Sequence, residues 1–374
     1  MNIGIVCYPT FGGSGVVATE LGKALASKGH KIHFITYQQP VRLDIFSANI
    51  FYHEVKVSDY PLFDYQPYEL VLTSKLVDVV KFEKLDLLHV HYAIPHASAA
   101  YMAQHILKSE GINIPFVTTL HGTDITLVGK DASFAPVITF AINESNAVTA
   151  VSESLKQDTL NHFGVKRAIE VIPNFICLEH YDNFEENESL KSSFAPDREK
   201  ILIHVSNFRK VKRAEDVLRV FDLVRKEKSV KLLMVGDGPE RNRLEQLCRA
   251  LKICHLVKFL GKVKDTERIL SIADVFILPS ESESFGLAAL EAMAAKTPVI
   301  STNTGGIPEV NKDGISGFLS NVGDVKSMAE NTLKIIKDDT TLNEFKAGAY
   351  EQAKVFDLGT VLPQYEGLYR KVIG

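Results

Sequence analysis

The chain has 374 residues, of which 45% are apolar and 24% are charged, and its formal net charge is −4. This length allows two domains, and the composition is ordinary for a globular protein. The small acidic excess argues against nucleic acid as the main partner, and no apolar run is long enough to span a bilayer.

Two further features predict a cytoplasmic protein without a membrane partner. The N-terminal sequence lacks the charged and apolar regions of a signal peptide. The four cysteines show no spacing typical of a metal site, so we expect them to be reduced thiols.

Apolar strands alternate with amphipathic helices along the first half of the chain. This alternation is typical of a parallel sheet that is covered by helices on both faces. Strands are predicted over residues 2–8, 31–36, 50–57, 85–91, 116–119 and 147–151, and helices over residues 16–27, 68–82, 96–108, 132–143 and 153–162.

A polar, acid-rich stretch over residues 179–199 separates this half from a second alternation of strands and helices. We therefore expect an α/β fold of two doubly wound, Rossmann-like domains, residues 1–175 and 176–358, which face each other across a ligand cleft. The last helix, residues 359–374, could pack back on the first domain. Strands of the second domain are predicted over residues 201–205, 231–235, 257–260, 275–278 and 299–301.

A glycine-rich loop, Gly12, Gly13, Ser14 and Gly15, follows the first strand and opens a helix. Free N–H groups at a helix N-terminus bind anions, so the loop is a candidate site for an acidic ligand. Its spacing approaches the dinucleotide-binding pattern, but residues 35–37 lack the acid that would hold an adenosine ribose. A tight turn that needs glycine is the alternative interpretation.

Polar side chains also stand where two neighbouring strands of the first half end. His89, His91 and Tyr92 come from one strand, and Thr119 and His121 from the next. Carboxyl ends of parallel strands meet at one edge of a sheet, so we expect a polar cluster there, with His91 or Tyr92 pointing toward the cleft. A metal held by the two strand histidines is an alternative, but no third ligand is apparent and we expect none.

The loops after the strands of the second half carry groups that suit a nucleotide. Four basic residues fall between residues 207 and 213, among them Arg209 and Lys212, and they could bind a diphosphate. Gly236 begins a tight turn after the next strand, and backbone groups near Val263 could contact a base. A solvated basic loop is the alternative interpretation.

Two glutamates frame the start of a helix that is predicted over residues 287–295. Glu283 precedes the helix, and Glu291 lies about one turn inside it. The N-terminal N–H groups would bind a phosphate, and a carboxylate one turn inside could accept ribose hydroxyls. A surface helix with solvated acids is the alternative. The backbone groups concerned belong to Ser284, Phe285, Gly286 and Leu287.

Together these motifs resemble the retaining glycosyltransferases of the glycogen-synthase-like group, family 4, which have the two-domain GT-B fold. The resemblance covers nearly the whole chain and rests on Glu283, Glu291, residues 236–239 and residues 305–309. Within the family, the chain is similar to the members that join N-acetylglucosamine to L-malate in the bacillithiol pathway. The residues that carry this narrower resemblance are 7–9, 12–17, 89–96, 118–124 and 206–213.

One position departs from the wider family. Asn207 stands where most members have an arginine, while Lys212 occupies the usual lysine position. Arg209 lies nearby and could supply the missing charge from a different position.

The resemblance implies a retaining, metal-independent hexosyltransferase without a cofactor. Its donor would be UDP-N-acetylglucosamine, and its acceptor the hydroxyl of L-malate. It implies catalytic roles for Glu283, His121, Lys212 and Arg209. The implied donor-binding residues are Glu291, Asn207, Gly236, Val263, Ser284, Phe285, Gly286 and Leu287. The implied acceptor-binding residues are Gly13, Ser14, Gly15, Tyr92, Thr119, Asn174 and Arg42.

Two other functions stay open at this point. An isomerase similar to UDP-N-acetylglucosamine 2-epimerases would share the two-domain architecture but act on the donor alone. A related glycosyltransferase could use a different acceptor, such as a lipid-linked sugar or inositol phosphate. The sequence leaves the oligomeric state open, a homo-oligomer included.

Overall fold

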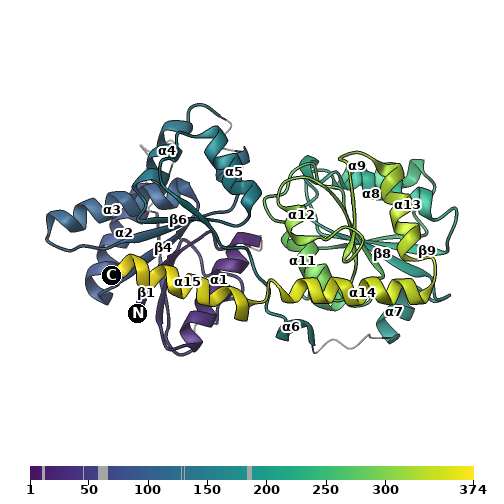
Figure 1. Ribbon diagram of the computed structural model, residues 1–374, viewed down its shortest axis with the longest axis horizontal. Coiled ribbons are helices and arrows are strands. Elements are labelled where there is room, and N and C mark those ends of the chain that lie inside the picture. Colours follow the sequence, from purple (N-terminus) through teal and green to yellow (C-terminus); the bar gives the residue numbers. More distant parts are fainter. Residues whose placement is uncertain (11–12, 45, 58–65, 128, 130, 183–187) are drawn as a thin grey trace. The chain divides into compact units, whose positions relative to one another are not determined.

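The computed structural model describes residues 1–374 except residues 11–12, 45, 58–65, 128, 130 and 183–187. The chain divides into two compact units (Figure 1). Unit 1 consists of Met1–Phe175 and Leu358–Gly374, and unit 2 of Ile176–Asp357. Among the helices of the described residues, none combines the length and the apolar character needed to cross a membrane.

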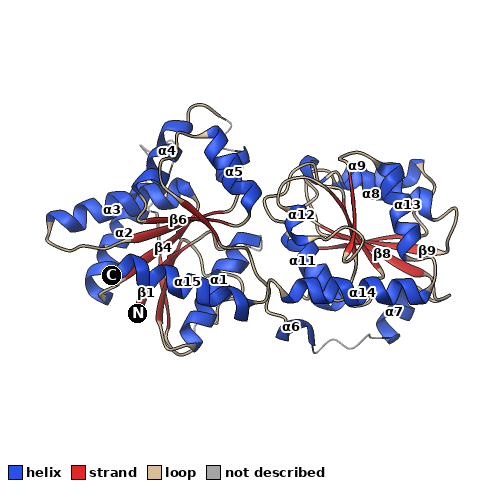
Figure 2. Cartoon of the chain, viewed as in Figure 1, coloured by secondary structure: helices blue, strands red, loops and turns tan. Residues whose placement is uncertain are grey.

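Unit 1 contains a seven-stranded parallel sheet in the order β3-β2-β1-β4-β5-β6-β7 (Figure 2). Every residue of β4 and β5 is buried, including two histidines and two threonines, as is usual for central strands that are covered on both faces. The strands are β1 Asn2–Val6, β2 Lys31–Thr36, β3 Ile50–Glu54, β4 Leu87–His91, β5 Phe116–Leu120, β6 Ala147–Ala150 and β7 Ile169–Val171.

Helices pack against both faces of this sheet. Val6 and Ile35 belong to the core formed with α2 and α3. Their neighbours Ile5 and Phe34 point to the opposite face, where α1 approaches so closely that a Cβ atom at Gly22 would lie 2.4 Å from the Phe34 ring. The helices of unit 1 are α1 Gly13–Ser27, α2 Tyr68–Glu83, α3 Ser98–Ser109, α4 Ala135–Glu144, α5 Glu153–His162 and α15 Leu358–Ile373.

The C-terminal helix α15 belongs to unit 1. Its Glu366 carboxylate lies 2.9 Å from Lys28 Nζ and 3.1 Å from His30 Nε2. Deeper in the unit, the buried Tyr369 hydroxyl lies 2.7 Å from His89 Nδ1. These contacts attach the last helix to the first half of the chain.

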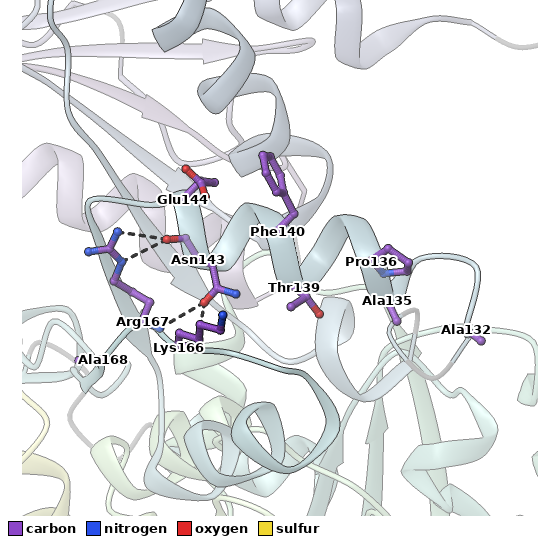
Figure 3. Close-up of a pocket in the computed structure, with 10 residues that line it drawn as sticks. All are labelled: Ala132, Ala135, Pro136, Thr139, Phe140, Asn143, Glu144, Lys166, Arg167 and Ala168. Atoms are coloured by element: carbon purple, nitrogen blue, oxygen red, sulfur yellow. Dashed lines mark hydrogen bonds between the residues drawn. The ribbon is translucent and has the colours of Figure 1, made fainter.

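A surface hollow of about 860 Å³ lies beside α4 (Figure 3). Arg167 closes one end by donating hydrogen bonds of 3.3 Å from Nε and 3.1 Å from Nη2 to the backbone oxygen of Asn143. None of the residues predicted to bind substrate lines this hollow. Its lining residues are Ala132, Ala135, Pro136, Thr139, Phe140, Asn143, Glu144, Lys166, Arg167 and Ala168.

Unit 2 contains a six-stranded parallel sheet in the order β10-β9-β8-β11-β12-β13. Its largest core joins α8, α9 and α13 to the sheet. The strands are β8 Lys200–Val205, β9 Val230–Val235, β10 Val257–Gly261, β11 Val275–Leu278, β12 Val299–Thr302 and β13 Gly317–Ser320. The helices are α6 Glu179–Asp182, α7 Glu188–Phe194, α8 Ala214–Val224, α9 Arg241–Ala250, α10 Thr266–Leu270, α11 Leu287–Ala294, α12 Ile307–Val310, α13 Val325–Ile335 and α14 Asp339–Lys354.

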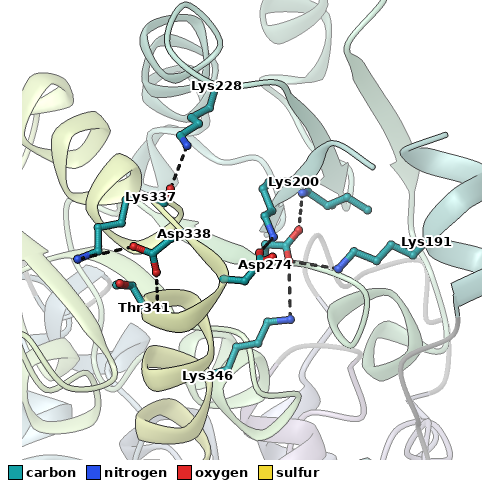
Figure 4. A network of polar contacts seen from close by, with 10 residues as sticks. Lys191, Lys200, Lys228, Asp274, Lys337, Asp338, Thr341 and Lys346 are labelled. Atoms are coloured by element: carbon teal, nitrogen blue, oxygen red, sulfur yellow. Dashed lines mark hydrogen bonds and ion pairs between the residues drawn. The ribbon is translucent and has the colours of Figure 1, made fainter. Parts of the chain in front are cut away.

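A buried carboxylate, Asp274, ties the outer helices of unit 2 to its sheet (Figure 4). Asp274 Oδ1 lies 3.2 Å from Lys191 Nζ on α7 and 3.7 Å from Lys346 Nζ on α14. Its Oδ2 accepts a 2.8 Å hydrogen bond from the backbone N–H of Ile201 on β8. Two lysines and a backbone donor offset the cost of burying this charge.

The expected class of fold, two doubly wound α/β units with parallel sheets, is confirmed. Strand order reverses between β1 and β4 in unit 1 and between β8 and β11 in unit 2. Ligands of such sheets bind at the carboxyl ends of the strands beside this reversal. The predicted polar loops follow these strands.

Candidate active site

The centre of the candidate site in unit 2 is an ion pair between Lys212 and Glu283. Lys212 Nζ lies 2.6 Å from Glu283 Oε1, and the Ser280 hydroxyl donates a 2.8 Å hydrogen bond to the same oxygen. The side chains of Lys212 and Glu283 are 22% and 13% exposed. Both charged groups are therefore partly screened from water but still within reach of a ligand.

A glycine loop after β12 holds the backbone of Glu283 in place. Gly306 donates a 2.9 Å hydrogen bond from its N–H to the Glu283 carbonyl oxygen. Gly305 has a φ of +58°, and a Cβ atom there would lie 2.0 Å from the same oxygen. Only glycine allows this close approach, which explains why residue 305 of the motif is glycine.

Two further glycines bring the loops after β8, β9 and β10 together. A Cβ atom at Gly236 (φ +117°) would lie 1.8 Å from the Ser206 carbonyl oxygen, and one at Gly238 would lie 1.9 Å from that of Asn207. The N–H of Gly236 also donates a 2.7 Å hydrogen bond to the Gly261 carbonyl oxygen. These three loops therefore lie together at one edge of the sheet.

The predicted nucleotide-contacting residues of these loops are open to a ligand. Asn207 and Arg209 are exposed, and Val263, after β10, is partly exposed. Lys212 follows in a short turn before α8. Whether each one contacts donor stays a prediction.

Helix α11 begins at Leu287, directly after Gly286 with a φ of +95°. Phe285 is buried and its ring meets that of Phe356 edge to face, with centroids 5.5 Å apart. Its side chain is thus part of the core, and only its backbone can serve a ligand. Ser284 precedes the helix and Glu291 lies one turn inside it, and both residues are partly exposed.

His204 on β8 connects the ends of β8 and β11 below the candidate site, and the sequence analysis did not single it out. It is buried, and its Nδ1 and Nε2 lie 2.8 Å from the Ile277 carbonyl oxygen and the Ser206 hydroxyl. Burial lowers the pKa of His204 to about 4, so the ring is neutral. A histidine inside an apolar strand pattern gives no signal of this role.

In unit 1, the candidate acceptor residues Tyr92 and Ser14 are in direct contact. The Tyr92 hydroxyl donates a 2.6 Å hydrogen bond to Ser14 Oγ. Ser14 lies in the first turn of α1, between Gly13 and Gly15, and a Cβ atom at Gly15 would lie 2.5 Å from the Tyr8 carbonyl oxygen. The loop therefore needs this glycine for close packing. Gly12 lies outside the described residues.

The polar cluster at the ends of β4 and β5 is a hydrogen-bonded network. His91 Nδ1 lies 2.8 Å from His121 Nε2, and His89 Nε2 lies 2.7 Å from the Thr119 hydroxyl. Thr119 is buried and its hydroxyl also contacts that of Thr149 at 2.7 Å. The Thr119 hydroxyl thus already has hydrogen-bond partners in His89 and Thr149. His121 and Tyr92, by contrast, are partly exposed and accessible to a ligand. Of the pair His91 and Tyr92, it is Tyr92 that is partly exposed.

Asp124 joins the loops that carry Tyr92 and His121. Its Oδ2 accepts a 2.8 Å hydrogen bond from the Ala93 N–H, and its Oδ1 accepts one of 3.2 Å from the Gly122 N–H. Burial raises the pKa of Asp124 to about 6, although the backbone donors oppose this shift. Asp124 therefore links the loop after β4 to the loop after β5.

The two remaining acceptor candidates lie in loops of unit 1. Asn174 follows β7 and is buried, and among the described residues its Oδ1 has no hydrogen-bond partner. Buried polar atoms are seldom left unpaired, so this oxygen is a candidate ligand contact. Arg42 lies in the loop after β2 and is partly exposed.

One group of potential metal ligands lies among the described residues of unit 1, at the edge of its sheet. Ligand atoms of His33, His53 and Glu83 lie within 4.8 Å of one another. His33 Nδ1 and His53 Nε2 are 2.9 Å apart, so the two rings bond to each other. This group contains no residue of the predicted site.

Comparisons with known proteins give the family. The model of "Glycosyltransferase Family 4" matches residues 11–180, and that of "Glycosyl transferases group 1" matches residues 185–352. The chain is 46% identical to the N-acetyl-alpha-D-glucosaminyl L-malate synthase of Bacillus anthracis, over 100% of this chain and 97% of that protein. The chain belongs to glycosyltransferase family 4.

This glycosyltransferase also resembles more distant proteins along its whole length. It is 29% identical to an uncharacterized glycosyltransferase of Methanocaldococcus jannaschii, over 91% of this chain and 90% of that protein. Anabaena HepE, solved in complex with UDP and glucose, matches with a TM-score of 0.84 at 20% identity, over 99% of this chain and 100% of that one. Sucrose-phosphate synthase of Thermosynechococcus elongatus matches with a TM-score of 0.80 at 22% identity, over 99% and 98%. These structures confirm the GT-B class of fold.

Proposed function

We propose that this glycosyltransferase transfers N-acetylglucosamine from UDP-N-acetylglucosamine to the hydroxyl of L-malate, with retention of configuration. The observation that carries the proposal is the 46% identity, over the whole chain, with the N-acetyl-alpha-D-glucosaminyl L-malate synthase of Bacillus anthracis. By this proposal the enzyme works in the cytoplasm, on small molecules, at the first step of bacillithiol biosynthesis.

In the proposed reaction, the malate hydroxyl oxygen forms a bond to the anomeric carbon while the bond from that carbon to UDP breaks. The β-phosphate oxygen of the leaving UDP takes the hydroxyl proton, so attack occurs from the face that UDP leaves. The largest catalytic demand is to stabilise the negative charge that develops on the diphosphate.

Unit 2 offers this stabilisation without a metal ion. Lys212 and the exposed Arg209 supply positive charge, and the backbone N–H groups from Ser284 to the start of α11 supply donors at a positive helix end. Glu283 now neutralises Lys212 at 2.6 Å. When the donor binds, Lys212 would turn to the diphosphate, and Glu283 to the hydroxyls of the sugar.

Unit 1 offers groups that suit a small dicarboxylate. Ser14 lies at the N-terminus of α1, where backbone N–H groups attract a carboxylate, and Tyr92 holds the serine hydroxyl at 2.6 Å. The partly exposed Arg42 could pair with the second carboxylate.

The experiment that tests the proposal measures UDP release from UDP-N-acetylglucosamine with L-malate, D-malate, inositol phosphate or no acceptor. Of these acceptors, we expect only L-malate to cause UDP release. The product should be α-linked by NMR, and EDTA should leave the rate unchanged. Release with inositol phosphate instead would favour another acceptor, and an epimerised donor without any acceptor would favour the isomerase. Either result overturns the proposal.

A further inference from the structure

We propose that His91 is a positioning residue that holds His121 in the tautomer with its proton on Nδ1. The consequence for catalysis rests on the proposed function and on the catalytic role that the family resemblance implies for His121. The tautomer itself follows from the hydrogen bonds of unit 1 alone.

The two rings share one hydrogen bond. His91 Nδ1 and His121 Nε2 are 2.8 Å apart, and the ring planes differ by only 24°. In a pair of neutral imidazoles, one nitrogen carries the proton and donates, and the other accepts. The distance does not say which one donates, but the surroundings of His91 do.

His91 is 0% exposed, and among the described residues its other nitrogen, Nε2, has no hydrogen-bond partner. If His91 Nδ1 accepted, the proton of His91 would sit on Nε2 as a buried donor without an acceptor. Orphaned buried N–H groups are rarer than unused acceptor positions, because the donor loses its hydrogen bond to water without replacement. His91 Nδ1–H therefore donates to His121 Nε2, and the proton of His121 sits on Nδ1.

The position of His91 is itself braced. The His96 ring donates from Nδ1 to the His91 carbonyl oxygen at 2.5 Å. The His89 ring packs against that of His91 with centroids 4.4 Å apart, and His89 is held by Tyr369 and Thr119. The ring of His91 thus has little freedom to turn away from His121.

Both rings are neutral in this arrangement. Burial and the neighbouring histidines lower the pKa of His91, and burial lowers that of His121 to about 3. His121 is partly exposed, and its Nδ1 makes no hydrogen bond to the residues that the structure describes. It therefore presents an N–H donor to a ligand. An oxygen atom of the sugar or of the leaving group could accept this bond, and His121 would not serve as a base.

The tautomer can be measured without any substrate. In protein labelled with ¹⁵N-histidine, two-bond ¹H–¹⁵N correlation spectra distinguish a proton on Nδ1 from one on Nε2, and His121→Gln and His91→Asn assign the two rings. We expect the proton on Nδ1 in both. A proton on Nε2 of His121, or a mixture of tautomers, would overturn the inference.

Two variants at residue 91 test the positioning role. Asparagine can place a donor where Nδ1 now lies, whereas leucine cannot, so His91→Leu should release the tautomer of His121 and lower kcat by about 10-fold to 100-fold. His91→Asn should keep the tautomer and most of the activity. A folded His91→Leu variant with an unchanged His121 spectrum would overturn the role, and if that variant does not fold, the wild-type spectrum still decides the tautomer. If the spectra agree but no malate-dependent transfer is found, the proposed function fails and the tautomer stands.

Discussion

Lys212 Nζ lies 2.6 Å from Glu283 Oε1, and these two residues are 71 positions apart in the chain. The pair joins the turn before α8 to the loop before α11, both at the carboxyl edge of the sheet in unit 2. The ammonium group of Lys212 and the carboxylate of Glu283 therefore neutralise each other before any ligand binds. In the proposed mechanism, donor binding exchanges this contact for contacts to the diphosphate and the sugar.

The first prediction concerns this pair. Lys212→Ala and Glu283→Gln should each lower kcat by about 100-fold or more, because each removes a group that acts on the reacting end of the donor. Turnover is measured by UDP release, and folding by circular dichroism. Lys326→Ala, at an exposed lysine on α13 of the same unit, is the control and should behave like the wild type. Full activity in both site variants would refute the assignment.

The second prediction concerns the glycine that packs on Glu283. Gly305→Ala should abolish most activity, because its Cβ atom would lie 2.0 Å from the Glu283 carbonyl oxygen and must displace it. Gly314→Ala is a matched control, since Gly314 has a φ of +74° but nothing within 4 Å of its Cβ position. Left-handed strain alone should cost the control about 1 kcal/mol of unfolding free energy and leave kcat intact. Equal activity in the two variants would show that the clash does not reach Glu283.

The third prediction concerns the contact between Tyr92 and Ser14. Burial raises the pKa of Tyr92 to about 12, so its hydroxyl keeps its proton and donates to Ser14. Tyr92→Phe and Ser14→Ala should each raise the KM for malate by about 10-fold without changing the KM for the donor. The double variant should be no worse than either single one, because both remove the same hydrogen bond. Tyr101→Phe, in a ring contact with Phe140, is the control; an unchanged malate KM in Tyr92→Phe would contradict the prediction.

The fourth prediction concerns acid stability. Burial lowers the pKa of His89 to about 3 and those of His96 and His204 to about 4, below an unfolded value of 6.5. The unfolded chain therefore binds protons that the folded chain does not, and each ring should cost about 1.4 kcal/mol of unfolding free energy per pH unit as the pH falls below about 6.5. The pKa of Asp124 is raised from 3.8 to about 6. Between about pH 6 and pH 3.8 this carboxyl group opposes the loss of stability, because the folded chain binds the proton of Asp124 more tightly than the unfolded chain does.

The net effect is a loss of stability toward acid, since these three histidines, together with His91 and His121, whose pKa values are also lowered, outweigh one carboxyl group. Urea unfolding at pH 7.5, 6.5 and 5.5, chosen to span this window at about one-unit steps, measures the slope. His204→Asn keeps a donor for the Ile277 carbonyl oxygen and should reduce the slope, because one titrating ring is gone. A constant unfolding free energy from pH 7.5 to 5.5 would contradict the prediction.

Most strands and helices follow from the sequence pattern. The predicted strands over residues 31–36 and 275–278 coincide with β2 and β11, and the predicted helix over residues 153–162 with α5. Two strands were not predicted. β7 and β13 have only three and four residues, so their apolar pattern is too short to stand out. Each pairs with the strand that precedes it in the chain, β6 and β12.

The sequence by itself determined the class of fold and the loops that carry the candidate site. Hydrophobic periodicity and glycine positions are local properties, and Gly236, Gly286 and Gly305 mark local backbone conformations. Only the tertiary structure decided which side chains meet: Lys212 with Glu283, Ser14 with Tyr92 across 78 positions, and His89 with Tyr369 across 280. These contacts depend on strand order and register, and periodicity records which face of an element is buried but not which element covers it.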